Sequence, residues 1–214
     1  MKATDALLDL LFPPKCPFCG KLLEKDQLLC PECQRELPWL TGAAGEKAVE
    51  LTRGCVSPLR YTGKVPDGVH GFKFDGRSAR SETFGLLIAQ CVKDRGLTAD
   101  LVSWPSLSPK RLRQRGYDQA ELLARRVGRE LDIPVARTVD KKEVPAQSGL
   151  EEESARRANV LGAYSAHRPE DFRGKTVLLV DDVVTTGATL SACAGVLLLG
   201  GAKEILCATL ARAR

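Results

Sequence analysis

The chain of 214 residues is long enough for one α/β domain of ordinary size with a small attached module. Hydrophobic residues make up 43% of it, charged residues 28% and aromatic residues 5%, which excludes a disordered or fibrous chain. The net charge of +5 favours phosphate-bearing partners, but it does not distinguish a nucleotide from a nucleic acid.

The apolar runs of the chain are short. The longest, over residues 192–199, falls well below the roughly 18 residues that cross a bilayer. Asp5 and Asp9 interrupt the apolar N-terminal stretch, which argues against a secretory signal. We therefore expect a cytoplasmic protein without a membrane span. In that compartment the eight cysteines are not expected to form a disulfide framework.

The N-terminal 40 residues combine a predicted helix with a cysteine-rich module. Clustered leucines predict a helix over residues 3–12, which Pro13 and Pro14 end. Two Cys-x2-Cys pairs follow, formed by Cys16, Cys19, Cys30 and Cys33. Four thiolates predict a closed tetrahedral zinc site of structural type, with a redox or iron–sulfur site as the alternative. Zinc binding contributes about 10–16 kcal/mol in small finger peptides, enough to order so short a segment.

Residues 41–47 are small and polar and predict a flexible hinge, which divides a zinc ribbon at 1–40 from a main domain at 41–214. In the main domain, strand patterns alternate with helix patterns. Strands are predicted at 55–61, 100–104, 176–180 and 204–210, helices at 81–93, 118–131 and 187–199, and a polar basic loop at 105–116. This alternation predicts an α/β fold with a mainly parallel sheet flanked by helices.

The strand at 176–180 leads into residues suited to a sugar phosphate. Asp181 and Asp182 follow it directly, and the turn after them contains Thr185, Thr186, Gly187, Ala188 and Thr189. Backbone N–H groups at the start of the next helix can hold a phosphate. Two adjacent carboxylates need partners, which the hydroxyls of a ribose or a ligand-borne Mg²⁺ would supply. An aspartate-capped turn without a ligand is the alternative.

The run DDVVTTGAT after an apolar strand resembles the 5-phosphoribosyl-1-pyrophosphate signature of type I phosphoribosyltransferases. The resemblance implies that Asp181 and Asp182 contact ribose hydroxyls, and that the five residues from Thr185 to Thr189 hold the 5-phosphate. A second stretch, over residues 71–78, approaches a phosphate-binding P-loop sequence. It has arginine in place of lysine and no buried strand before it, so we interpret it as chance.

The predicted loop at 105–116 is rich in positive charge, with Lys110, Arg111, Arg113 and Arg115 and few acidic neighbours. Two interpretations remain open. The four cations form a clamp over a pyrophosphate or a nucleic acid, because arginine pairs with phosphate oxygens through two hydrogen bonds. Alternatively, the segment is a solvated charged turn.

Four motifs in order resemble the ComF family of competence-type, phosphoribosyltransferase-like proteins: the four-cysteine ribbon, RQRGYDQA, QSGLEEESARRANVLGAY and DDVVTTGAT. The family usually shows RGFN-Q where this chain has RGYDQ from Arg115 to Gln119. A second polar cluster of the family matches Gln147, Arg156, Arg157 and Asn159. The resemblance implies a role in DNA uptake during natural transformation, with single-stranded DNA and uptake proteins as partners.

Two hypotheses follow. As an enzyme, the protein would take phosphoribosyl pyrophosphate with Mg²⁺ and displace pyrophosphate from C1, with Asp181, Asp182 and Arg115 as catalytic residues. As an adaptor, it would bind the sugar-phosphate of single-stranded DNA in the same cleft, with affinity that falls steeply with salt. Stacking of bases would need exposed aromatic side chains, and the candidates are Trp39, Trp104, Tyr117 and Tyr164. The remaining cysteines, Cys55, Cys91, Cys193 and Cys207, are expected in the core.

Overall fold

The computed structural model describes residues 13–24, 26–74, 80–142 and 162–214. The helix predicted at 3–12 and the polar cluster predicted at 147–159 lie outside these ranges. No helix in the described ranges is long and apolar enough to cross a membrane.

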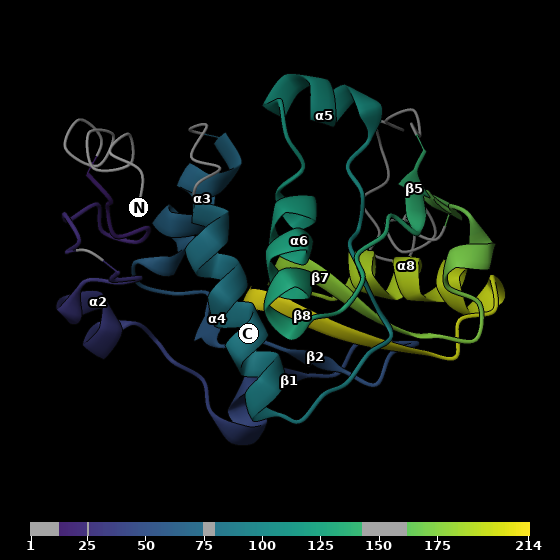
Figure 1. Ribbon diagram of the computed structural model, residues 1–214, viewed down its shortest axis with the longest axis horizontal. Coiled ribbons are helices and arrows are strands. Elements are labelled where there is room, and N and C mark those ends of the chain that lie inside the picture. The colour runs from purple at the N-terminus through teal and green to yellow at the C-terminus, as the bar shows by residue number, and fades with distance from the viewer. Residues whose placement is uncertain (1–12, 25, 75–79, 143–161) are drawn as a thin grey trace.

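A mainly parallel sheet forms the centre of the protein, as the sequence predicts (Figure 1). Its strands are β1 (Glu46–Lys47), β2 (Cys55–Val56), β3 (Leu59–Arg60), β4 (Leu101–Ser103), β7 (Thr176–Val184) and β8 (Glu204–Arg212). The order across the sheet is β1-β2-β8-β7-β4, and β3 also pairs with β8. Every pair is parallel except β1 with β2.

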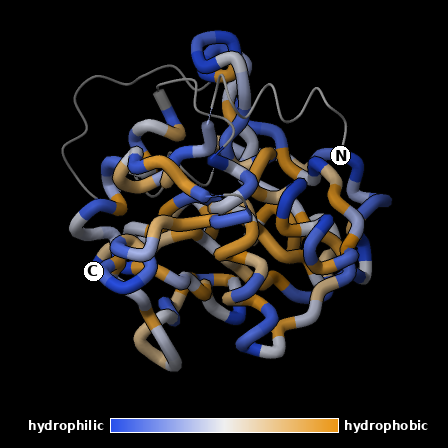
Figure 2. The backbone as a smooth tube through the Cα atoms, turned by 60° about the vertical axis from the view of Figure 1, so that its left-hand side comes forward, coloured by the Kyte–Doolittle hydropathy of each residue, from blue (hydrophilic) through white to orange (hydrophobic). Residues whose placement is uncertain are grey.

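Helices cover both faces of this sheet. On one face lie α3 (Val65–Phe74), α4 (Arg80–Asp94) and α6 (Gln119–Leu131), and on the other lies α8 (Ala188–Leu199). Side chains alternate along β7, so Leu178 and Val180 join the first core while Val177 and Leu179 join the second. Burial on both faces explains the continuous apolar run of this strand. In Figure 2, hydrophobic residues (orange) run through the interior and hydrophilic residues (blue) predominate at the tip that projects at the top.

Three predicted elements differ from the structure. The first predicted strand is split into β2 and β3 at Ser57 and Pro58, because proline cannot donate to a ladder. Strand β7 continues to Val184, so the two aspartates lie inside it. The predicted hinge contains the 3-10 helix η1 (Gly42–Gly45) and strand β1, so it is not an irregular link.

The predicted basic loop at 105–116 contains helix α5 (Pro109–Arg115). Ser108 accepts a hydrogen bond from the Arg111 N–H (3.4 Å), Pro109 opens the helix, and Gly116 ends it with φ +78. These are ordinary helix start and stop signals. Sequence analysis missed them because a seven-residue helix with no buried residues gives no periodic hydrophobic pattern. Figure 1 shows α5 standing above the rest of the fold.

Four short elements have no counterpart in the prediction. They are α2 (Pro31–Glu36) in the cysteine module, the two-stranded antiparallel sheet of β5 (Val139–Lys141) and β6 (Tyr164–Ala166), and the 3-10 helix η2 (Pro169–Asp171). Each is too short to give a periodic hydrophobic signal.

The four clustered cysteines have the geometry of a metal site. Their sulfur atoms lie within 4.8 Å of one another, and the Cys19 and Cys30 sulfurs are 3.5 Å apart. Tetrahedral zinc with Zn–S bonds of about 2.3 Å places its sulfur ligands about 3.8 Å apart, so the set fits. The Cys33 N–H also donates to the Cys30 sulfur (3.4 Å), as thiolates in such knuckles accept. Four sulfur ligands leave no open position, which supports structural zinc.

The cysteine module packs directly against the main domain. The Phe18 ring lies 5.2 Å from the Phe84 ring on α4, and Cys16, Cys30 and Cys33 belong to the same core cluster. The two predicted domains therefore share a core, and their boundary near residue 41 stays a prediction. The four other cysteines are buried, as expected.

Asp118 caps α6 with both of its carboxylate oxygens. Oδ1 accepts from the N–H groups of Ala120 (3.1 Å) and Glu121 (3.3 Å), and Oδ2 accepts from the N–H of Leu107 (2.8 Å). Burial raises the pKa of Asp118, while these three N–H groups act against that shift. The residue therefore fastens the segment after β4 to the start of α6.

Replacement of Cys30 by serine is expected to remove the zinc, of which the wild type should carry about one ion per chain. Because the module shares its core with the main domain, the melting temperature should fall as well. Metal analysis and thermal unfolding measure both effects, with Cys91→Ala as a control that keeps its zinc. Wild-type protein without zinc would contradict the prediction.

Asp118→Asn is expected to lower stability by about 1 kcal/mol, because asparagine has one acceptor oxygen for bonds that aspartate shares between two. A change of that size lowers the melting temperature by about 2–4 °C in a domain of this length. Asp118→Ala should cost more. Calorimetry of both variants checks the order, and an Asp118→Asn variant as stable as wild type would show that the Leu107 bond contributes nothing.

Candidate functional site

A cleft of about 330 Å³ opens where β4 and β7 end. This is the edge at which open α/β sheets bind their ligands. Six of the predicted site residues line it: Asp181, Asp182, Thr185, Thr189, Arg111 and Arg115. Thr186, Gly187 and Ala188 lie in the same turn, whereas Lys110 and Arg113 lie on α5 but do not line the cleft. The structure therefore brings most of the predicted residues together.

The turn between β7 and α8 is shaped for an anion. Gly187 has φ +84, and a Cβ atom there would lie 3.0 Å from Val49 Cγ2, so only glycine fits comfortably. As the N-cap of α8, Gly187 offers no side chain to the N–H groups of the first turn. The Ala188 N–H reaches Thr186 Oγ1 (3.3 Å). The positive end of a twelve-residue helix thus begins beside the cleft, and its N-cap residue supplies no side-chain cap.

The two aspartates occupy opposite faces of β7 and both reach the cleft. Asp182 points to the face covered by α3, where its carboxylate lies 2.9 Å from Lys73 Nζ. Asp181 points toward α8, and its Oδ1 accepts from the Asp182 N–H (2.8 Å). Burial, and then the charge of Asp182, raise the pKa of Asp181 well above its usual range. Among the described residues no ion pair is formed by Asp181, whose carboxylate remains an acceptor at the cleft.

Positive groups line the opposite side of the cleft. Arg111 and Arg115 are four residues apart, which places both on one side of α5. Arg115 Nη1 donates to Gln119 Oε1 (2.8 Å). Lys141 on β5 lies over the ring of Tyr164, 5.0 Å from its centre. Burial and the charge of Arg111 lower the pKa of Lys141. An anionic group placed here would relieve that repulsion.

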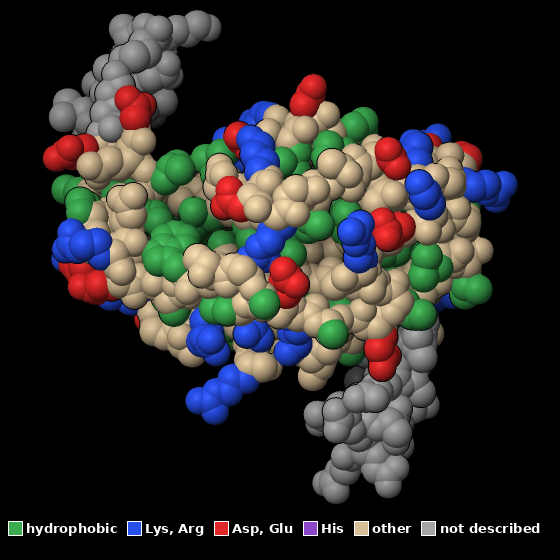
Figure 3. Space-filling model, turned by 90° about the horizontal axis from the view of Figure 1, so that it is seen from below, with side chains coloured by type: hydrophobic (Ala, Val, Ile, Leu, Met, Phe, Trp, Pro, Cys, Tyr) green, Lys and Arg blue, Asp and Glu red, His purple; other side chains and the backbone are tan. Residues whose placement is uncertain are grey.

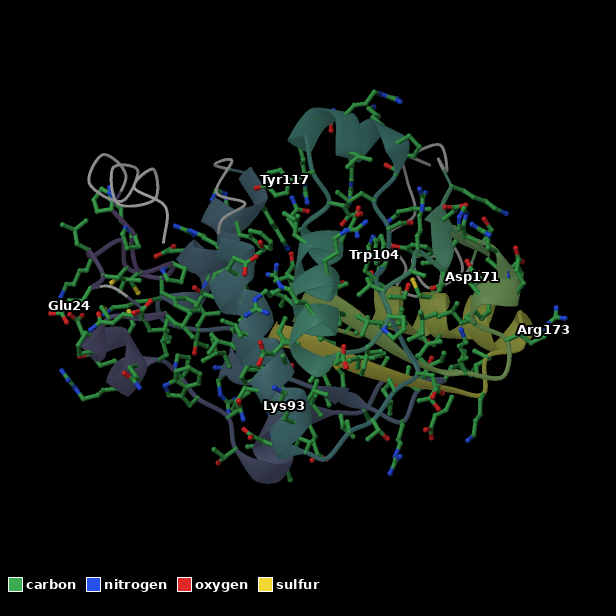
Figure 4. All side chains as sticks on the ribbon, viewed as in Figure 1. Glu24, Lys93, Trp104, Tyr117, Asp171 and Arg173 are labelled. Carbon is green, nitrogen blue, oxygen red and sulfur yellow. The ribbon has the colours of Figure 1, made fainter. Side chains whose placement is uncertain are left out.

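Hydrogen bonds fix the walls of the cleft to one another. Ser106 Oγ donates to the Val139 carbonyl (2.8 Å) and accepts from the Lys141 N–H (3.1 Å), which ties β5 to the segment after β4. On the other side, the Tyr117 hydroxyl donates to the Phe72 carbonyl at the end of α3. Figure 4 shows Tyr117 beside that helix end and Trp104 deeper in the fold.

Sequence reasoning missed several residues of the cleft, among them Tyr61, Lys73, Ser106 and Lys141, and it considered Tyr164 only for base stacking. Lys73 belongs to the stretch at 71–78 that resembles a P-loop, and residues 71–74 of that stretch form the end of α3. Lys141 and Tyr164 pair across β5 and β6, with no local motif to reveal them.

The four aromatic residues considered for base stacking have different positions. Trp104 and Tyr164 are buried, and Tyr117 is half-buried with its hydroxyl bonded. Trp39 is 38% exposed and donates from its indole N–H to the Gln34 carbonyl (2.8 Å). These four residues therefore form no exposed stacking surface.

Two family models match the chain. The phosphoribosyl transferase domain matches residues 115–214, and the double zinc ribbon domain matches residues 7–47. The first covers the α5–α6 junction, the acid pair of β7 and the turn before α8, and the second covers all four clustered cysteines.

Relatives match over most of the chain. Competence protein F of Haemophilus influenzae is 33% identical over 94% of this chain and 85% of its own length. DNA utilization protein YhgH of Escherichia coli K12 is 28% identical over 91% of this chain and 90% of its own length. Among solved structures, a purine phosphoribosyltransferase from Pyrococcus horikoshii is 22% identical, with a TM-score of 0.38 over 62% of this chain and 72% of that one. The family rests on the first of these matches: the chain belongs to the competence protein F family, with a zinc ribbon joined to a phosphoribosyltransferase domain of type I fold.

Proposed function

We propose that the cleft binds phosphoribosyl pyrophosphate with Mg²⁺ and that the protein transfers its phosphoribosyl group to an acceptor. One observation carries the proposal: the start of α8, which has a glycine as its N-cap, and the acid pair of β7 line a single cleft together with the cationic side chains of Arg111 and Arg115. Donors for a phosphate and acceptors for sugar hydroxyls therefore lie within the reach of one sugar phosphate.

In this arrangement the 5-phosphate lies at the N–H groups of residues 185–189, and the ribose hydroxyls lie at Asp181 and Asp182. The pyrophosphate then extends toward Arg111 and Arg115 on α5, with Lys141 beside them. Guanidinium groups suit this place because they bind phosphate oxygens in pairs. A different sugar phosphate in the cleft would contact the same N–H groups, aspartates and cationic side chains.

The reaction would displace pyrophosphate from C1 of the ribose. The bond from C1 to the pyrophosphate oxygen breaks with its electron pair on the oxygen, and the acceptor forms the new bond to C1. The carbon gains positive character in between, which nearby Asp181 and Asp182 would stabilise, while Arg115 would stabilise the leaving group. Mg²⁺, carried by the phosphates, would neutralise their charge.

The cellular role proposed from the relatives is the uptake and use of DNA in the cytoplasm. One relative is named a competence protein and another a DNA utilization protein. DNA-uptake proteins and single-stranded DNA are the partners that this role implies. In that role, the protein would bind its sugar-phosphate ligand while it takes part in the handling of incoming DNA strands.

A non-catalytic adaptor for single-stranded DNA is the second candidate. It is favoured by Lys110 and Arg113, which are exposed on α5 outside the cleft and extend the positive surface beyond a single ligand. The lack of an exposed stacking surface among the four aromatic candidates weighs against it. Figure 3 shows the face seen from below, on the side away from α5, where acidic and basic side chains are intermixed and several basic ones gather along the lower edge.

Saturating phosphoribosyl pyrophosphate with Mg²⁺ is expected to raise the melting temperature of the wild type. At one hundred times Kd the stabilisation is about 2.7 kcal/mol, and each kcal/mol adds about 2–4 °C at this length. The double variant Asp181→Asn/Asp182→Asn should lose the shift, and exposed Asp132→Asn should keep it. No shift in the wild type would contradict the proposal. Steeply salt-dependent binding of a single-stranded oligonucleotide alone would then favour the adaptor.

Asp181→Asn is expected to stabilise the protein without ligand at pH 8. Because the folded-state pKa of Asp181 is raised, the folded chain binds more protons than the unfolded chain between the ordinary and the raised value, so stability falls as pH rises through that window. Asparagine removes this loss. Melting temperatures from pH 4 to 8.5 should show a gain of a few degrees at pH 8 that vanishes near pH 4. A less stable variant at pH 8 would mean that the carboxylate is favourably paired.

A further inference from the structure

Lys73 lines the cleft from α3, and it lies in the last turn of that helix. Its ammonium is 2.9 Å from Asp182, a buried carboxylate of the acid pair. We propose that Lys73 is a positioning residue that holds Asp182 for the ligand, and that the zinc ribbon sets the position of Lys73 through α3. This inference rests on the proposed binding of phosphoribosyl pyrophosphate.

The end of α3 is fastened to the cleft by side chains from the α5–α6 junction. The Tyr117 hydroxyl donates to the Phe72 carbonyl, and Gln119 Nε2 donates to the Lys73 carbonyl (3.4 Å). Carbonyl groups in the last turn of a helix lack partners within the helix, so these donors satisfy them. Gln119 also accepts from Arg115, so the backbone of Lys73 and a clamp arginine share one partner.

The rest of α3 is held by the zinc ribbon. Phe18, which stands between the ligands Cys16 and Cys19, lies so close to α3 that a Cβ atom at Gly68 would be 2.7 Å from its ring. Just before α3, Lys64 Nζ pairs with Glu32 (2.5 Å) and Glu36 (3.2 Å) on α2. Exposed ion pairs contribute little, so the aromatic contact is the main constraint.

A series of tilted and edge-to-face aromatic contacts continues from Phe18 toward the cleft. Phe18 packs on Phe84, Phe84 meets Phe72 edge to face at 5.6 Å, and Phe72 lies 6.2 Å from Tyr117. All three contacts lie in one core cluster. Figure 1 shows α3 between the ribbon and α6. Helix α3 is therefore held by the ribbon on one side and by the cleft segment on the other.

The consequence is that ligand affinity depends on the ribbon, although none of the cleft-lining residues in the described ranges belongs to it. The carboxylate of Asp182 is buried and the Lys73 side chain is 28% exposed, so displacement of Lys73 leaves a buried charge without its partner. If Phe18 no longer fixes α3, Lys73 moves from Asp182 and the acid pair loses its orientation.

A double-mutant cycle on the full, zinc-loaded chain tests this. The variants are Lys73→Ala, Phe18→Leu and both together, with Kd for phosphoribosyl pyrophosphate and Mg²⁺ measured by calorimetry and zinc content measured in parallel. Lys73→Ala should weaken binding about tenfold or more, and Phe18→Leu several-fold with its zinc kept. The double variant should bind no more weakly than Lys73→Ala, because both changes remove the same interaction. Lys73→Arg should restore part of the affinity.

Phe172→Leu is the matched control. Phe172 is fully buried in the other core cluster and does not line the cleft, so its loss should lower stability with Kd unchanged. Should Phe18→Leu prove insoluble, Gly68→Ala displaces α3 from the ribbon and is expected to weaken binding in the same way. Additive effects, or a Lys73→Ala variant with wild-type Kd, would overturn this inference while the proposed function stands. A wild type that does not bind the ligand would overturn both.

Discussion

Strand β7 must bury apolar side chains on both faces and still carry two adjacent carboxylates into a cleft. Alternation along the strand separates the two charges, since Asp182 faces α3 and Asp181 faces α8. Lys73 neutralises Asp182, whereas Asp181 has a backbone N–H and a pKa raised by burial. The two carboxylates therefore have acceptor oxygens beyond those that Lys73 engages. Such oxygens suit a ligand that is rich in hydroxyl groups.

The parallel topology explains why the positive groups meet this pair. Strands β4 and β7 are neighbours, so the segments that follow them leave the sheet at the same edge. One segment supplies Arg111 and Arg115 on α5, and the other supplies the start of α8. Ser106 and Asp118 then fix the first segment, to β5 and to α6 respectively. The cationic side chains of α5 and the acid pair of β7 therefore converge because of strand order, although they lie far apart in the sequence.

The zinc ribbon contributes to this site from a distance. Its own segment is too short to bury a sizeable core, and metal ligation replaces that core. Its buried residues then join those of α3 and α4 in one cluster. A module that looks separate in sequence is thus packed against the helix that carries Lys73. Because the ribbon and α3 share one core cluster, a substitution in the ribbon is expected to change ligand affinity at the cleft.

Local sequence determined much of this protein. The cysteine spacing, the long amphipathic helix ending at Leu131, the buried strand at 176–180 and the turn from Thr185 to Thr189 are contiguous patterns, and their chemistry depends on near neighbours. The mainly parallel sheet followed from their alternation. By contrast, the partner of Asp182 lies 109 positions away on α3, and Lys141 reaches the cleft on a three-residue strand. Only the tertiary structure decided these contacts, because side chains so distant in sequence are brought together by packing and strand order, which no local pattern encodes.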